Sequence, residues 1–143
     1  MEFPMGVNTN ELDLMSYHAL SHHGKDESRL VQLAVIETYL FEQYARFLTK
    51  LKETKTATGA SLFDNTAVIM GSGMSDGSRH SNRDLPVVLA GGGIKHQGHV
   101  VCPEEDHKRI PLSNLWLSTL QWFGVETEQF GRSTGTFTPM ELA

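Results

Sequence analysis

The chain has 143 residues, a length that fits one domain with a core of its own. Its 12 basic and 17 acidic residues give a formal net charge of −5 with the histidines neutral, and the basic residues are scattered, which argues against a nucleic-acid-binding protein. No apolar run approaches the about 20 residues of a membrane span. The first residues do not follow the pattern of a signal peptide, and a single cysteine, Cys102, excludes an internal disulfide.

The first predicted element is a helical turn within residues 14–23 that carries two histidines. His18 and His22 stand four residues apart, so on a helix they share one face. Gly24 follows directly and suits either the position after a helix or a tight turn.

The longest predicted element is an amphipathic helix from about Asp26 to Thr54, a stretch without Pro or Gly. Asp26 or Ser28 can cap its start. Glu37 interrupts the apolar pattern, and either it sits at the edge of the stripe or it is a buried carboxylate that faces a polar cluster. The apolar side chains that recur every three or four residues are Leu30, Leu33, Leu40, Tyr44, Phe47 and Leu51.

Two short apolar runs, Ala67–Met70 and Val87–Ala90, are bounded by turn residues, which predicts strands buried on both faces. Such strands are typical of α/β sheets, whose faces are covered by helices. A second helix is predicted over Leu112–Phe123. We therefore expect a single α/β domain over residues 1–143, with a small, mostly buried sheet and the long helix on one of its faces.

The polar loop between the two strands is the expected ligand loop, because loops beyond strand ends are the usual place for chemistry in α/β sheets. It is not a dinucleotide-binding fingerprint, since no helix begins inside it. Its serines 72, 75 and 78 stand outside any Gly-x-Ser-x-Gly elbow, which argues against a nucleophilic role. We expect its glycines to permit positive φ and close backbone approach. The residues predicted to form the ligand loop are Gly71, Ser72, Gly73, Gly77 and Asp84.

Histidines and aspartates near this loop predict a metal site. Imidazole and carboxylate groups suit zinc or another divalent cation. The alternative is that the histidines are partly buried and bonded to backbone, and that Asp76 and Asp84 cap turns. The candidate ligands of the metal are His18, His22, His80 and Asp76.

Segments along nearly the whole chain resemble, in the same order, a bacterial family known as a domain of unknown function, the fifteen-fifty-two family. The segments that carry the resemblance are Ser21-His-His-Gly24, Phe41–Lys52, Gly71-Ser-Gly-Met-Ser-Asp-Gly77, Asp84–Gly92, Pro111–Leu115 and Phe130-Gly-Arg-Ser-Thr-Gly135. The resemblance covers the C-terminal part of a typical member, so it implies a fragment of a longer α/β protein. Members often carry export signals, which implies a periplasmic or extracellular protein.

That family is in turn distantly similar to the alkaline phosphatase and sulfatase superfamily. The resemblance implies that His18 and His22 stand at an early ligand pair, where His18 replaces the aspartate of the superfamily, and that His80 stands at a late ligand histidine. The superfamily also has an Asp-His pair at a strand end, where this chain has Gly71-Ser-Gly-Met, with Asp76 a few residues later. The superfamily nucleophile and its first metal aspartate belong to the N-terminal part, outside this sequence.

Three functional interpretations follow. The first is part of a metal-dependent hydrolase of phosphate or sulfate esters. The second is a non-catalytic binding or structural module with a degenerate site. The third is an unfinished domain whose open sheet edge drives self-association.

Overall fold

The computed structural model describes residues 16–95 and 97–140. Contacts divide the chain into two compact units, one of Met1–Glu53 with Met70–Val87 and one of Thr54–Ile69 with Val88–Ala143. We call them unit 1 and unit 2. The single domain expected from the sequence stays a prediction. Within the described ranges, no helix combines the length and the apolar character needed to cross a bilayer.

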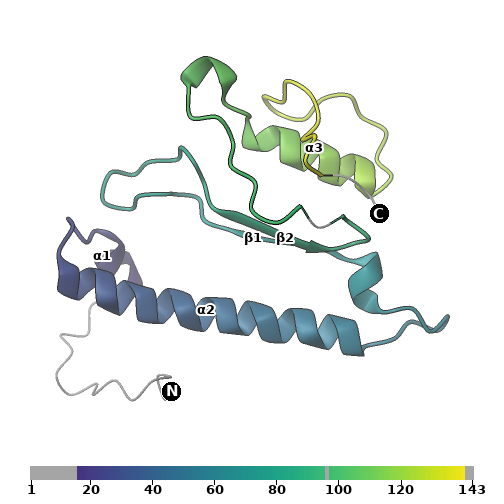
Figure 1. Ribbon diagram of the computed structural model, residues 1–143, viewed down its shortest axis with the longest axis horizontal. Coiled ribbons are helices and arrows are strands. Elements are labelled where there is room, and N and C mark those ends of the chain that lie inside the picture. Colours follow the sequence, from purple (N-terminus) through teal and green to yellow (C-terminus); the bar gives the residue numbers. More distant parts are fainter. Residues whose placement is uncertain (1–15, 96, 141–143) are drawn as a thin grey trace. The chain divides into compact units, whose positions relative to one another are not determined.

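Unit 1 begins with the short helix α1, Tyr17–Ser21, which confirms the predicted helical turn. The Ser16 hydroxyl accepts a hydrogen bond from the Ala19 amide at 3.2 Å and so caps the helix. Leu20 is only 2% exposed and is the buried apolar side chain of this helix. Helix α1 packs against the helix that follows it (Figure 1).

Helix α2, Glu27–Glu53, confirms the long helix predicted from the sequence. Asp26 caps its start, because the carboxylate accepts a hydrogen bond from the Arg29 amide at 2.9 Å. Glu27 adds a negative charge in the first turn, and Lys50 and Lys52 add positive charges in the last, both favourable to the helix dipole.

The apolar stripe of α2 is less buried than its pattern predicts, since no residue of this helix is fully buried. Leu33 and Tyr44 are half-buried, whereas Leu40 is 41% and Phe47 49% exposed. Burial raises the pKa of the Tyr44 phenol above its usual value. Glu37 is exposed, which favours a position at the edge of the stripe over a buried carboxylate.

Strands β1, Ala67–Gly71, and β2, Val87–Gly91, pair in a two-stranded antiparallel sheet. The mixture of helices and strands confirms the α/β character, but the expectation of a mostly buried sheet is wrong. Most strand residues are only half-buried, and Gly71 and Val88 are exposed. In a sheet of two strands each strand has one neighbour, so the strands are not enclosed like the central strands of a larger sheet. That α2 covers one face of this sheet stays a prediction.

Unit 2 contains the 3-10 turns η1, Leu62–Asn65, and η2, Asp106–Lys108, and the helix α3, Leu112–Trp122. Helix α3 confirms the second predicted helix. Its Leu115 and Leu117 are 6% and 1% exposed and form the buried apolar core of this unit.

The end of α3 is fixed to the chain after β2 through Trp122, whose indole Nε1 donates to the Gly92 carbonyl at 2.7 Å. A Cβ atom at Gly92 would lie 2.8 Å from the indole ring, and its φ of +66° is left-handed. Only glycine fits this contact without strain.

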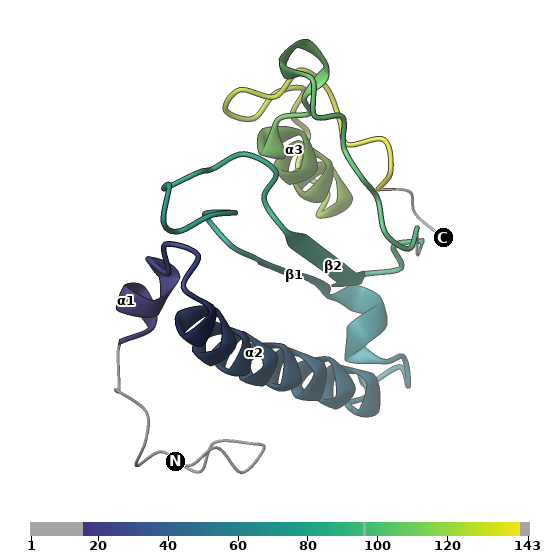
Figure 2. The same cartoon turned by 60° about the vertical axis from the view of Figure 1, so that its left-hand side comes forward.

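The segment after α3 is an irregular strap held to that helix by hydrogen bonds (Figure 2). Asn114, only 5% exposed, accepts from the Thr134 amide at 2.9 Å and donates to the Thr134 hydroxyl at 3.3 Å. Ser118 accepts from the Phe137 amide at 2.8 Å. The segments Pro111–Leu115 and Phe130–Gly135, which are far apart in the sequence, are therefore in contact.

Candidate metal-binding site

Three histidines from two distant parts of the sequence lie together in unit 1. The ring centroids of His18 and His22 are 4.8 Å apart, and those of His22 and His80 are 4.9 Å apart. The planes meet at 70° and 88°, so the rings contact one another edge to face. His22 is the central member, half-buried, and the two outer rings are exposed.

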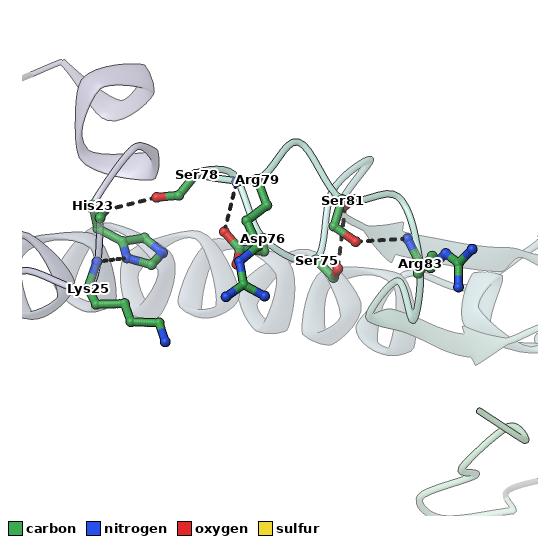
Figure 3. Close-up of polar contacts among 9 residues, drawn as sticks. His23, Lys25, Ser75, Asp76, Ser78, Arg79, Ser81 and Arg83 are labelled. Atoms are coloured by element: carbon green, nitrogen blue, oxygen red, sulfur yellow. Dashed lines mark hydrogen bonds and ion pairs between the residues drawn. The ribbon is translucent and has the colours of Figure 1, made fainter. Parts of the chain in front are cut away.

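Helix α1 places the first two histidines, because one helical turn brings residues four apart onto the same face. His22 is the C-cap residue of α1, directly after Ser21. Its carbonyl accepts from the Arg29 guanidinium at 3.2 Å, which ties the end of α1 to the first turns of α2. His23, next in the chain, makes a local bond in which its Nδ1 accepts from the Lys25 amide at 3.0 Å (Figure 3).

His80 comes from a closed turn of residues 76–81 in the loop between β1 and β2. Asp76 and Ser81 form an isolated antiparallel bridge, and the Ser81 amide donates to the Asp76 carbonyl at 3.0 Å. The Asp76 carboxylate accepts from the Arg79 amide at 3.2 Å and lies 3.6 Å from the Arg79 guanidinium (Figure 3). Asp76 therefore caps this turn, as the alternative interpretation of its role predicts.

The backbone of His80 is left-handed, with φ of 51°. Few residues other than glycine adopt this conformation, although histidine is among the more tolerant. The turn's own bonds hold it, including one from the His80 amide to the Gly77 carbonyl at 3.3 Å.

The turn also touches the corner between α1 and α2. The Ser78 hydroxyl accepts a hydrogen bond from the Gly24 amide at 2.9 Å (Figure 3). Gly77 lies so close to α1 that a Cβ atom there would be 2.7 Å from the Ser21 carbonyl oxygen. Sequence reasoning did not single out Ser78 for this role, and no pattern in the chain pairs it with Gly24.

The remaining predicted loop residues have separate local roles. At Gly71 an added Cβ atom would lie 2.9 Å from the Pro86 carbonyl, which confirms close backbone approach. The Ser72 hydroxyl donates to the Met74 carbonyl at 2.7 Å. Gly73 has open space around it. Asp84 is exposed and left-handed, with φ of 53°.

The prediction that the loop glycines permit positive φ is wrong for all three of them. Gly71, Gly73 and Gly77 are absent from the left-handed region, which in this loop is taken by His80 and Asp84 instead. The glycines at 71 and 77 serve close approach, because another strand or helix lies where a side chain would be.

As the rings lie, no three His, Cys, Asp or Glu side chains among the described residues are arranged to hold a metal ion. The separation of the rings nevertheless fits a shared ion. Two imidazoles bound to one zinc through nitrogens about 2 Å from the metal have ring centres about 5 Å apart. A change of side-chain rotamer would convert the observed arrangement of the rings into one in which their nitrogen atoms share an ion.

Two open cavities of the protein belong to unit 2. One of about 470 Å³ has four aromatic side chains in its lining, those of Trp116, Trp122, Phe123 and Phe130. The other, of about 640 Å³, is lined by Gln121 and the residues that follow α3. Neither includes a predicted metal ligand.

Comparison of the chain with models of known protein families, with curated protein sequences and with solved structures finds no match. The resemblance to the fifteen-fifty-two family therefore stays a prediction.

Proposed function

We propose that His18, His22 and His80 bind a divalent cation, zinc in the first place. We further propose that the chain is the C-terminal, alkaline-phosphatase-like part of an exported metal-dependent hydrolase of phosphate or sulfate esters. The observation that carries the proposal is the meeting of His80 with His22, at a centroid distance of 4.9 Å, across a large sequence separation. Two outer rings are exposed, so an ion can reach the cluster from solvent.

Three imidazoles suit a catalytic rather than a structural metal, because catalytic zinc sites keep three protein ligands and one open position. A bound cation would polarise the ester oxygen and lower the pKa of a water molecule. The histidines themselves would orient the ion and leave one side free for substrate. Asp76 was predicted as a further ligand, but its carboxylate is engaged by Arg79, so the proposal does not require it.

The direct test is zinc binding to the full chain by isothermal titration calorimetry. We expect about one zinc ion per chain, with affinity at least about tenfold to a hundredfold weaker in His22→Ala and in His80→Ala. His107→Ala is the matched control, because His107 is exposed on η2 in unit 2. Unchanged affinity in His22→Ala and His80→Ala would refute the proposed ligand set.

The second candidate function is a non-catalytic binding module. It is favoured by Asp76, a predicted ligand whose carboxylate is engaged by the Arg79 amide and guanidinium, as expected of a degenerate metal site. Turnover of an aryl phosphate and an aryl sulfate distinguishes the two when it is measured on the zinc-loaded longer protein of which this chain is proposed to be the C-terminal part, because that protein would supply the nucleophile. Zinc binding without turnover of either ester supports the module, whereas turnover that is lost in His80→Ala supports the hydrolase.

A further inference from the structure

The loop between β1 and β2 reaches the histidines of α1 through two neighbouring contacts. Ser78 accepts the hydrogen bond of the Gly24 amide at 2.9 Å, and Gly77 lies against the Ser21 carbonyl. On either side of the turn the chain is exposed, at residues 71–75 and 82–84. Such flanks lose conformational entropy when they are held, so the turn needs an anchor to stay against α1.

Hydrogen bonds within the turn fix the position of His80 relative to Ser78. The ends of the turn are joined by the bond from the Ser81 amide to the Asp76 carbonyl at 3.0 Å and by the bond from the His80 amide to the Gly77 carbonyl at 3.3 Å. His80 is two residues beyond Ser78 in the same closed turn. A fixed Ser78 therefore fixes where the imidazole of His80 can lie.

We propose that Ser78 is a positioning residue whose hydroxyl, bonded to the Gly24 amide, latches the turn onto the corner between α1 and α2 and holds His80 against His22. The inference rests on the proposed function in one respect, the binding of a metal ion by the three histidines. The latch itself is a property of the metal-free protein. The position of His80, the third ligand, therefore depends on the Ser78 hydroxyl, which makes no described bond to any of the three rings.

Ser75 offers a matched comparison within the same loop. Its hydroxyl lies 3.4 Å from the Ser81 carbonyl and bonds inside the loop, not to α1. Ser75→Ala removes one hydroxyl from the loop, as Ser78→Ala does, but leaves the hydrogen bond between Ser78 and Gly24 intact.

The experiment measures the nuclear Overhauser effect between ring protons of His22 and His80 in the metal-free full chain, followed by zinc affinity. We compare the wild type with Ser78→Ala, Ser78→Thr and Ser75→Ala. The contact should vanish in Ser78→Ala and persist in the other three proteins, since threonine retains the hydroxyl. Zinc affinity should fall about tenfold to a hundredfold in Ser78→Ala alone, as for other groups that orient ligands.

Each result decides one of the two claims. A His22–His80 contact that persists in Ser78→Ala overturns the latch, whatever the zinc affinity. A contact that responds as expected in a protein that binds no zinc supports the latch and refutes the metal site. If circular dichroism shows that Ser78→Ala does not fold, Ser78→Cys is measured in its place, because a thiol sulfur is only a weak hydrogen-bond acceptor. A ring contact that keeps its wild-type strength in Ser78→Cys overturns the latch equally.

Discussion

At the scale of single residues, the left-handed backbone conformations of the loop lie at His80 and Asp84, not at its glycines. A left-handed conformation at a residue other than glycine costs about 1–2 kcal/mol. His80 has φ of 51°. The hydrogen bonds that close the 76–81 turn offset this cost, each contributing about 0.5–1.5 kcal/mol. The strained residue is also the one that meets His22, and such strain often accompanies functional sites.

Gly77 and Gly73 give a matched pair of substitutions in this loop. An added Cβ atom at Gly77 would lie 2.7 Å from the Ser21 carbonyl oxygen, whereas Gly73 has nothing within 4 Å. We expect Gly77→Ala to lower the free energy of unfolding by about 1–3 kcal/mol, as overpacking does. Gly73→Ala should leave it unchanged or raise it by about 0.4–1 kcal/mol, since alanine restricts the unfolded chain. Urea unfolding followed by circular dichroism measures both, and equal stabilities would contradict the close contact at Gly77.

The sequence named all three histidines as candidate ligands, but its patterns could place only His18 and His22 relative to one another. The four-residue spacing of His18 and His22 fixes their shared face once a helical turn forms, because helix geometry is local. The approach of His80 to His22 depends on where a long irregular loop folds back, and no periodic pattern encodes that. The bond between Ser78 and Gly24 escaped prediction for the same reason, since a backbone amide leaves no signal in the sequence.

At the scale of elements, α2 was the most predictable part and its surroundings the least. Its start at Glu27 follows from the Asp26 cap, and its length follows from the absence of Pro and Gly. The sequence also showed which side chains are apolar. It could not show how far they are buried, because burial depends on the segments that pack against them. Leu40 and Phe47 remain exposed for that reason.

The strand boundaries were equally predictable, but the burial of the strands was not. A short apolar run bounded by turns identifies a strand, yet the same run suits a central strand or a hairpin. In the strap after α3, the hydrogen bonds to Asn114 and Ser118 join residues about 20 positions apart, a pairing that no periodic pattern indicates.

The two-stranded sheet leads to a prediction about self-association. Each strand has one partner within the described sheet, and exposed strand edges pair readily with other chains. We expect the sedimentation coefficient of the wild type to rise with protein concentration. Val88→Lys, at a strand position that is 38% exposed, should reduce this rise, because a lysine disfavours edge pairing.

Val101→Lys is the control for that experiment, since Val101 is 73% exposed and lies outside the strands. It should not change the association. A wild type that stays monomeric at every concentration would contradict the prediction, and so would equal effects of the two lysines.

At the scale of the whole molecule, the two units have small cores. Among the described residues the buried hydrophobic side chains are Leu20, Leu115 and Leu117. Further strands and helices from an N-terminal part would cover the exposed apolar side chains of α2, which is what the proposed origin in a longer α/β protein predicts. The superfamily nucleophile would come from that same part. The histidine cluster, in contrast, is complete within unit 1.

The central claim is that histidines from α1 and from the loop share one metal ion, and X-ray absorption at the zinc edge tests it most directly. For the zinc-loaded full chain we predict three imidazole nitrogens at about 2.0–2.1 Å, with the multiple-scattering pattern of histidine rings. His80→Ala should lose one of these nitrogens. A zinc ion surrounded by oxygen atoms alone, or an imidazole count that His80→Ala leaves unchanged, would contradict the claim.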